Sequence, residues 1–306
     1  MATTRWIDNE IRHLDEILDR LRVRTRVVTN EVKDKVQYNN FKIVPLNNRS
    51  YTMSFKDKDI NFYYVSFSYD AVSNGEEPVE DRTKTYQGYI IVYYDGIKIS
   101  YIISRNSDAL KILRFLLGYT GKNEITNNSF EVSSDFFIWL INRVFNKNNT
   151  LTDVSDDESG EIIVNSIIGL RGDTEDLLSR VVTDGDSVMN ILSTLSFLLE
   201  SKEMKQIKVR LEYPKHENIE LVLNTSGTVG VYMKEYIGDF EKEEAELQKA
   251  KLLLFIYIEL LPKLKQQYLS DIDNNMWNFE LHKKFLNNVA EELQGKIEER
   301  KQSLVV

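Results

Sequence analysis

An apolar run at Ser133–Asn146, SSDFFIWLINRVFN, constrains this chain more than any other stretch. Ser133, Ser134 and Asp135 can accept hydrogen bonds from the free N–H groups of a first helical turn. Nearly every following residue is apolar, so the helix has no side suited to water and is predicted to be buried. It is too short to span a bilayer. We therefore expect a central core helix, with a β-rich region before it and an α/β region after it.

Composition limits the compartment and the source that we expect. The chain has 306 residues, enough to bury a large core without disulfides or a structural metal. The lack of cysteine excludes disulfides, thiolate metal sites and cysteine nucleophiles, and it fits a reducing compartment. The start lacks a secretory signal, and every apolar run is too short for a transmembrane helix. We expect a cytoplasmic protein without membrane contact, and frequent Asn, Lys and Ile indicate a bacterial or phage (mobile-element) type.

The N-terminal region predicts a long amphipathic helix over residues 4–35. Apolar residues recur there at alternating spacings of four and three, which is the a/d pattern of a coiled-coil seam. The seam consists of Ile7, Ile11, Leu14, Leu18, Leu21, Val28 and Val32. A narrow stripe of this kind packs against one partner helix, either in the same chain or in another copy. A homo-oligomer is therefore one expected assembly.

A basic cluster, formed by Arg20, Arg22, Arg24 and Arg26, lies in the second half of this predicted helix. Because these residues alternate with others, a strand with the arginines on one face is the rival interpretation. Phosphate contacts need cations on one surface, which makes the cluster a candidate nucleic-acid contact. Nearby acidic residues and the net charge of −9 favour ordinary paired charges on a solvated helix instead.

The next region predicts a β-rich domain closed by two helices. Aromatic and β-branched segments at Phe41–Pro45, Tyr51–Phe55 and Ile60–Tyr69 indicate strands. Asp95 and Gly96 lie between two further strand-like segments and predict a hairpin with a type I′ turn. Many of the 16 tyrosines fall in this meander. Their face of the sheet is either ordinary half-buried packing or an aromatic binding platform.

The second half predicts a linker, another domain and a helical end. A dense run of acidic residues indicates the linker, and Asp173–Val182 is expected to be helical within the domain that follows. Pro262 is expected to kink or end a C-terminal helix. The predicted regions are residues 1–36 (heptad helix), 37–147 (β-rich domain), 148–160 (acidic linker), 161–238 (α/β domain) and 239–306 (helical region). Together they predict an α+β fold, with an antiparallel β-meander region and a second α/β region joined around a buried central helix.

The search for catalytic motifs yields no catalytic, cofactor or metal-binding residues. The three histidines, His13, His216 and His282, stand alone in the sequence and are expected at the surface. Phosphate-binding glycine motifs and a nucleophile elbow are absent from the sequence. A metal-dependent nuclease needs only a few acids and a lysine, for which the candidates are Glu31 with Lys33, and Glu80 and Asp81 with Lys84.

These observations favour a non-enzymatic protein that acts through protein–protein interaction, as a regulator or inhibitor. The predicted partners are a second copy of the chain, another protein, or both, and no cofactor is expected. The first alternative is a nucleic-acid-binding component of a bacterial antiphage defence system that uses Arg20–Arg26. The second alternative is a metal-dependent nuclease whose site is assembled only by the fold.

Overall fold

The computed structural model describes residues 2–27, 31–33, 36–105, 107–151, 160–174, 180–184, 196–199 and 201–303. The chain divides into two compact units. Unit 1 comprises Met1–Ser129 and Glu243–Leu253, and unit 2 comprises Phe130–Lys242 and Leu254–Val306. Helices are combined with antiparallel sheet, which confirms the predicted α+β class. Among the described residues, no helix is both long and apolar enough to cross a membrane.

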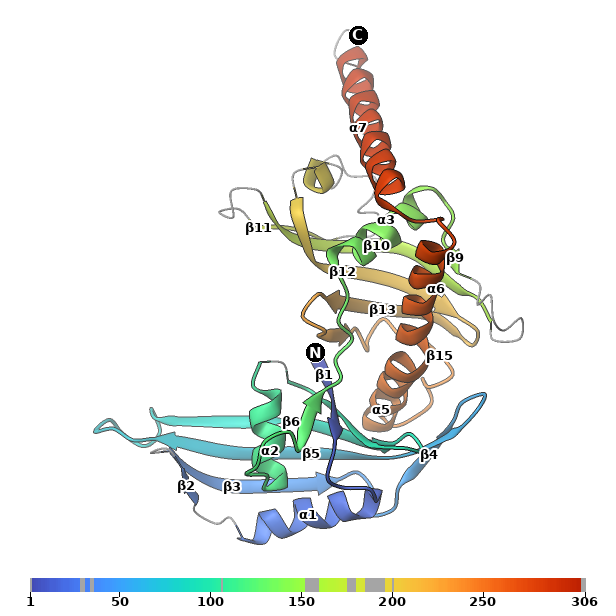
Figure 1. The fold of residues 1–306 in the computed structure, drawn as a ribbon. Helices are drawn as coiled ribbons and strands as arrows, with labels where there is room; N and C mark the ends of the chain where they lie inside the picture. Colours follow the sequence, from blue (N-terminus) through green and yellow to red (C-terminus); the bar gives the residue numbers. More distant parts are fainter. Residues whose placement is uncertain are drawn as a thin grey trace. The chain divides into compact units, whose positions relative to one another are not determined.

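Unit 1 is built on an antiparallel sheet with the strand order β1-β7-β6-β5-β3-β2 (Figure 1). Its strands are β1 (Ala2–Asp8), β2 (Glu31–Lys33), β3 (Val36–Pro45), β4 (Tyr51–Ser54), β5 (Asp59–Ser73), β6 (Thr83–Tyr94), β7 (Ile99–Ile103) and β8 (Ile125–Asn127). Strand β4 pairs with β5, and β8 pairs with β1. Helices α1 (Leu14–Val27) and α2 (Ala109–Leu117) pack on this sheet, where alternate strand residues form an apolar core.

The helix predicted over residues 4–35 is wrong in its first part, because the chain forms strand β1 there. Ile7 lies opposite Ser100 of β7 on one side and Thr126 of β8 on the other. Hydrogen bonding to two neighbouring strands overrides the heptad pattern, since local propensity yields to tertiary context. The helix begins only at Leu14, and residues 31–33 form strand β2.

The predicted seam packs inside unit 1 wherever the structure describes its residues in α1 and just before it. Ile11, Leu18 and Leu21 belong to its core, and Leu14 is partly buried against that core. This burial favours the intrachain alternative for the seam. Val28 and the side chain of Val32 lie outside the described residues.

A buried carboxylate fixes the connection between β1 and α1. Asp8 is fully buried, and its Oδ1 accepts hydrogen bonds from the backbone N–H groups of Glu10 and Ile11, both at 2.9 Å. Its Oδ2 accepts from the hydroxyls of Tyr101 at 2.5 Å and Tyr119 at 2.7 Å. Burial first, and the neighbouring Asp8 second, raise the pKa of Tyr101 well above its usual value. The carboxylate therefore joins β1, β7, the start of α1 and the segment after α2.

The predicted hairpin is present, but its turn is not type I′. Tyr94 pairs with Ile99, so the connection between β6 and β7 is residues 95–98. Gly96 has a positive φ of 95°, whereas Asp95 does not. The Asp95 side chain instead accepts from the N–H groups of residues 97 and 98, at 2.9 and 2.8 Å. This local hydrogen bonding, which Asp favours in turns, selects the longer connection.

Unit 2 contains a second antiparallel sheet, in which β11, β10, β12 and β13 follow one another. Its strands are β9 (Thr150–Leu151), β10 (Ile162–Thr174), β11 (Arg180–Asp184), β12 (Ser201–Tyr213), β13 (His216–Asn224), β14 (Val229–Val231) and β15 (Ile237–Gly238). The helix predicted at Asp173–Val182 is wrong at both ends, because β10 and β11 pair there, and residues 175–179 between them lie outside the described residues. On the other side of β10, Gly172 allows a close approach of β12, since a Cβ at this position would lie only 2.5 Å from Ser201 Oγ. Residues 152–159 of the predicted linker lie outside the described residues.

The predicted central helix is confirmed as α3 (Ser134–Phe145). Ser133 is its N-cap and accepts a hydrogen bond from the N–H of Phe136 at 3.3 Å. Residues 136–141 are all buried, as expected from their uniformly apolar character. The core of unit 2 therefore forms where this helix packs on β10 and β12.

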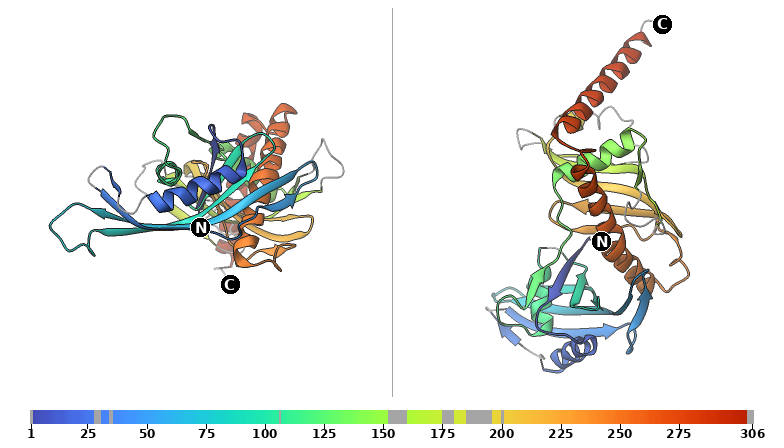
Figure 2. Two further views of the ribbon diagram at one scale, coloured as in Figure 1. Left: turned by 90° about the horizontal axis from the view of Figure 1, so that it is seen from below. Right: turned by 45° about the vertical axis from the view of Figure 1, so that its right-hand side comes forward.

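The C-terminal region is helical, as predicted. Its helices are α5 (Ala245–Phe255), the π-helical turn η2 (Ile256–Leu260), α6 (Leu261–Asp273) and α7 (Phe279–Gln302). Pro262 lies in the first turn of α6, just after η2. Because proline has no backbone N–H, it cannot donate a hydrogen bond to the preceding turn, and this position suits it. Helix α7 runs on beyond the sheet of unit 2 (Figure 2), and only Phe285 and Val289 are buried along it.

A substitution at Asp8 tests whether its hydrogen bonds stabilise unit 1. In Asp8→Asn, an amide N–H group replaces one acceptor, so buried hydroxyl or backbone donors lose their partner. We expect the free energy of unfolding to fall by about 3 kcal/mol, measured by urea denaturation. The exposed turn residue in Asp57→Asn should change it by less than about 0.5 kcal/mol. Equal stability of the two variants would contradict the proposed role of Asp8.

Candidate functional site

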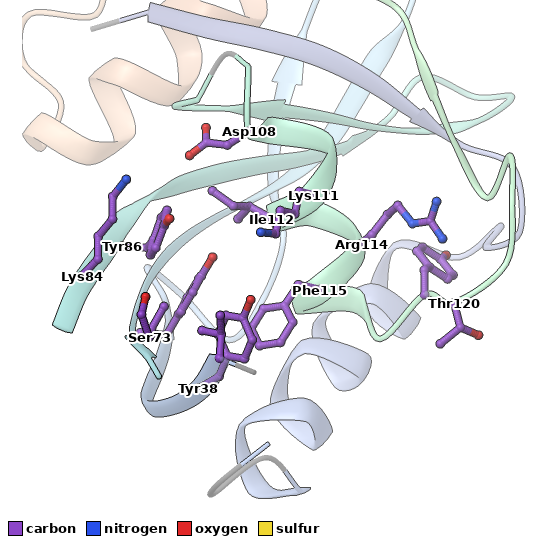
Figure 3. Close-up of a pocket in the computed structure, with 14 residues that line it drawn as sticks. Tyr38, Ser73, Lys84, Tyr86, Asp108, Lys111, Ile112, Arg114, Phe115 and Thr120 are labelled. Carbon is purple, nitrogen blue, oxygen red and sulfur yellow. The ribbon is translucent and has the colours of Figure 1, made fainter. Parts of the chain in front are cut away.

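A tyrosine-lined cavity of about 480 Å³ lies in unit 1. Strands β3, β5 and β6 form one wall, and helix α2 forms the other (Figure 3). The lining residues include Tyr38, Tyr69, Ala71, Ser73, Lys84, Tyr86, Asp108, Lys111, Arg114, Phe115, Tyr119 and Thr120. Natural ligand pockets have volumes of about 300–1,000 Å³, so this cavity has the size of a small-molecule site.

Strand register brings the aromatic side chains of the wall together. Tyr69 of β5 lies directly opposite Tyr86 of β6, and their rings stack with centroids 5.1 Å apart and an angle of 12°. Directly opposed residues on antiparallel strands point to the same face of the sheet. From α2, Phe115 contacts this layer, with its ring 5.2 Å from Tyr69 and 4.6 Å from Tyr38.

Small side chains on β5 leave the space that the cavity occupies. Beyond Tyr69, the same face of β5 continues with Ala71 and Ser73, because side chains on one face recur every second residue. Ala71 lies between Tyr38 on β3 and Lys84 on β6, which are its partners on either side. A short side chain flanked by long ones produces a hollow in the sheet surface. The sequence 69–73 therefore encodes both the ring layer and the gap beside it.

The rim of the cavity carries more positive than negative charge. Lys84, Lys111 and Arg114 supply cations, and Asp108 supplies the acid (Figure 3). The Lys84 ammonium lies 4.9 Å from the centroid of the Tyr86 ring, a cation–π distance. Arg114 is held by Glu124 at 3.5 Å.

Burial raises the pKa of the Tyr69 hydroxyl, and nearby Tyr86 and Tyr38 add to this effect. Tyr69 therefore stays protonated at neutral pH, and its hydroxyl can donate a hydrogen bond. The hydroxyls of Ser73 and Thr120 also lie at the cavity. The wall thus combines apolar ring surface with a few polar groups, which is the usual chemistry of a binding pocket.

Part of the predicted basic cluster reaches this site indirectly. Arg20 stacks over the ring of Tyr119 at 4.8 Å, and Tyr119 lines the cavity. Arg22 instead donates to Asn48 Oδ1 at 2.6 Å and lies 3.8 Å from Asp19. The side chains of Arg24 and Arg26 lie outside the described residues.

The structure describes the side chains of only one of the two residue sets considered for a metal-dependent nuclease. Residues 31–33 form strand β2, although a helix was predicted there, and their side chains lie outside the described part of the chain. Glu80 and Asp81 lie in the loop between β5 and β6, whereas Lys84 extends over Tyr86. Within the described residues, no group of three or more His, Cys, Asp or Glu side chains could hold a metal ion.

A second polar cluster lies in unit 2, around Asp135 at the start of α3. Its Oδ2 accepts hydrogen bonds from Tyr268 at 2.7 Å and from the Trp277 indole at 2.8 Å, and His282 Nδ1 lies 3.0 Å from its Oδ1. Burial opposes ionisation of Asp135, but hydrogen bonds from His282, Trp277 and Tyr268 outweigh it and lower the pKa of the carboxyl below 3.8. Both oxygens are thus occupied in joining α3, α6 and α7, which indicates a structural role.

The histidines correct one expectation from the sequence. His13 is exposed as predicted, but His216 is buried beside Tyr236, with 2.7 Å between His216 Nδ1 and the tyrosine hydroxyl. Burial lowers the pKa of His216, so its ring is neutral at pH 7. His282 is half-buried and paired with Asp135. Spacing in the sequence could not reveal these contacts, because each partner is far along the chain.

No protein-family model matches this chain, and no curated protein is significantly similar to it. The residues themselves therefore carry the functional argument. The sequence shows the tyrosines but leaves their role open between packing and binding. The signal that could have found the cavity was the short side chain of Ala71 between the large residues Tyr38 and Lys84, its partners on the neighbouring strands.

The Asp135 cluster predicts a specific dependence of stability on pH. Because the folded-state pKa of Asp135 lies below its unfolded value, its contribution is fully present above pH 3.8 and is lost as pH falls through the lower folded value. Asp135→Asn should therefore lower the free energy of unfolding by about 1 kcal/mol at pH 7, with a smaller difference in strong acid. Urea denaturation at several pH values tests this. In the exposed variant Asp273→Asn, the free energy of unfolding should differ little from that of the original protein at any pH. A loss of stability in Asp135→Asn that is the same at every pH would contradict the assignment.

Proposed function

We propose that this protein is a non-enzymatic binding protein that takes a planar group of its ligand into the tyrosine-lined cavity of unit 1. The observation that carries this proposal is the coincidence of volume, ring surface and polar rim in one place. Tyr38, Tyr86 and Phe115 supply the ring surface, and Ser73 and Thr120 supply neutral polar groups. Aromatic walls bind flat ligands through apolar contact, and sparse polar groups fix their orientation.

The second candidate function is association with another protein through unit 2. The observation that favours it is a set of large apolar side chains exposed around the connection of α6 to α7, consisting of Leu269, Ile272, Met276 and Phe279. Phe279 is 78% exposed and Met276 is 65% exposed. Contiguous exposed apolar residues mark protein–protein contacts. This candidate retains the partner class predicted from the sequence.

A cavity-filling substitution tests the first proposal. Ala71→Phe places a ring in the space beside Tyr69, so we expect it to abolish binding of indole and adenosine, measured by ligand-observed NMR. Ser73→Phe fills the exposed mouth of the same cavity and serves if the first variant folds poorly. Ser66→Phe adds the same ring to the opposite face of β5 and should leave binding unchanged. Binding that survives both cavity-filling variants would contradict the proposed site.

Replacing the exposed apolar residues tests the second candidate. The variant Met276→Asp with Phe279→Asp places charge on that surface, and we expect it to reduce the molar mass of any assembly seen by light scattering. Because both residues are exposed, the free energy of unfolding should change by less than about 0.5 kcal/mol. The matched variant Val79→Asp changes an exposed apolar residue of unit 1 and should leave the assembly intact. An unchanged molar mass in the double variant would exclude this surface.

A further inference from the structure

We propose that the ligand of the cavity is a nucleotide, whose base lies against the tyrosine rings and whose phosphate is bound by Lys84 and Lys111. This inference rests on the proposed function and names the ligand class for the same site. It joins two observations, namely a ring-lined hollow and a pair of cations at its rim. A nucleotide carries the complementary pair, a flat base and an anion, separated by a sugar.

The cavity wall fits the base. Tyr38 presents aromatic surface from the sheet, and Phe115 presents it from the helix. A nucleobase has a π-face that gains about 1–3 kcal/mol by stacking on an aromatic side chain. The hydroxyls of Ser73 and Thr120 lie within the lining and can bond to polar atoms on the base edge. Ring surface and base-edge partners therefore occur in one cavity.

The rim fits the phosphate. Lys111 projects from α2 and Lys84 from β6, on the two walls of the cavity (Figure 3). Neither lysine forms an ion pair with a described residue, so both ammonium groups remain available to an anion. Arg114, in contrast, is already engaged with Glu124. Ammonium groups bind phosphate through charge-assisted hydrogen bonds, which are about twice as strong as neutral ones.

Charge also excludes the main alternative for an aromatic cavity, a quaternary ammonium ligand. Such ligands occupy cages of aromatic rings, and a nearby acid improves their binding. Here Asp108 is the acid at the cavity, whereas Lys84 and Lys111 would repel a cation. The whole chain has a net charge of −9, so this local excess of positive charge is a property of the site.

Calorimetric titration of the full chain tests the inference, with adenosine monophosphate, adenosine, inorganic phosphate and N-trimethyllysine as probes. We expect adenosine monophosphate to bind at least about tenfold more tightly than adenosine, because one charge-assisted contact contributes about 1.4 kcal/mol. Inorganic phosphate should bind more weakly than the nucleotide, since it lacks the base. Preferential binding of N-trimethyllysine would overturn the inference.

Charge-removing variants assign the contact to particular lysines. Lys84→Ala and Lys111→Ala should each weaken binding of adenosine monophosphate by about tenfold and binding of adenosine by much less. Lys58→Ala removes the same charge from an exposed turn of unit 1 and should change neither affinity. If all three variants weakened binding equally, the effect would be general electrostatics, and the assignment of the phosphate site would be wrong.

The same titrations separate this inference from the proposed function. If adenosine and adenosine monophosphate bind equally, and Ala71→Phe abolishes both, the phosphate site is wrong but the binding function stands. If adenosine monophosphate, adenosine and indole all fail to bind, both proposals fail.

If adenosine monophosphate binds, a short oligodeoxyadenylate distinguishes the two sources of the ligand, a free nucleotide and a nucleic-acid strand. Tighter binding than the mononucleotide identifies a nucleic-acid strand, and equal binding identifies a free nucleotide.

Discussion

Unit 1 depends on a negative charge placed where water cannot reach it. A buried carboxylate is costly unless hydrogen bonds replace its hydration. Asp8 receives four such bonds, two from backbone N–H groups and two from tyrosine hydroxyls. The two backbone donors lie between β1 and α1, one tyrosine lies on β7, and the other follows α2. The carboxylate is therefore fully hydrogen-bonded only when all of these segments are in place together. Stability and geometry are coupled at this residue.

This constraint extends to the cavity. Tyr119 donates to Asp8 with its hydroxyl and lines the cavity with its ring, and Arg20 covers the outer face of that ring. One wall residue is thereby held from two directions. The opposite wall is held by sheet register, through the pairing of Tyr69 with Tyr86. A hollow between two fixed walls persists without a ligand, which reduces the ordering cost of binding.

Local patterns in the sequence predicted those features of the fold that depend on residues close together in the chain. The apolar run of α3 and its Ser133 cap were both recognisable. The strand at residues 2–8 was not, because its partners lie about a hundred residues further along the chain. The cavity was likewise out of reach, since it requires α2 to lie over particular residues of β3 and β5. The histidine contacts failed for the same reason, with His282 meeting Asp135 only in the folded chain.

The discontinuous make-up of unit 1 has a consequence for how the protein is made. Its last segment, residues 243–253, is synthesised only after residues 130–242 of unit 2. Until then the ring stack of Tyr64 and Tyr89 lacks Lys249, whose ammonium lies 5.2 Å from the Tyr89 ring. Domains generally fold as units while the chain emerges, N-terminal part first. Here one apolar face of unit 1 stays incomplete until residues 243–253 have been synthesised. A chain that stopped before these residues would leave both units incomplete.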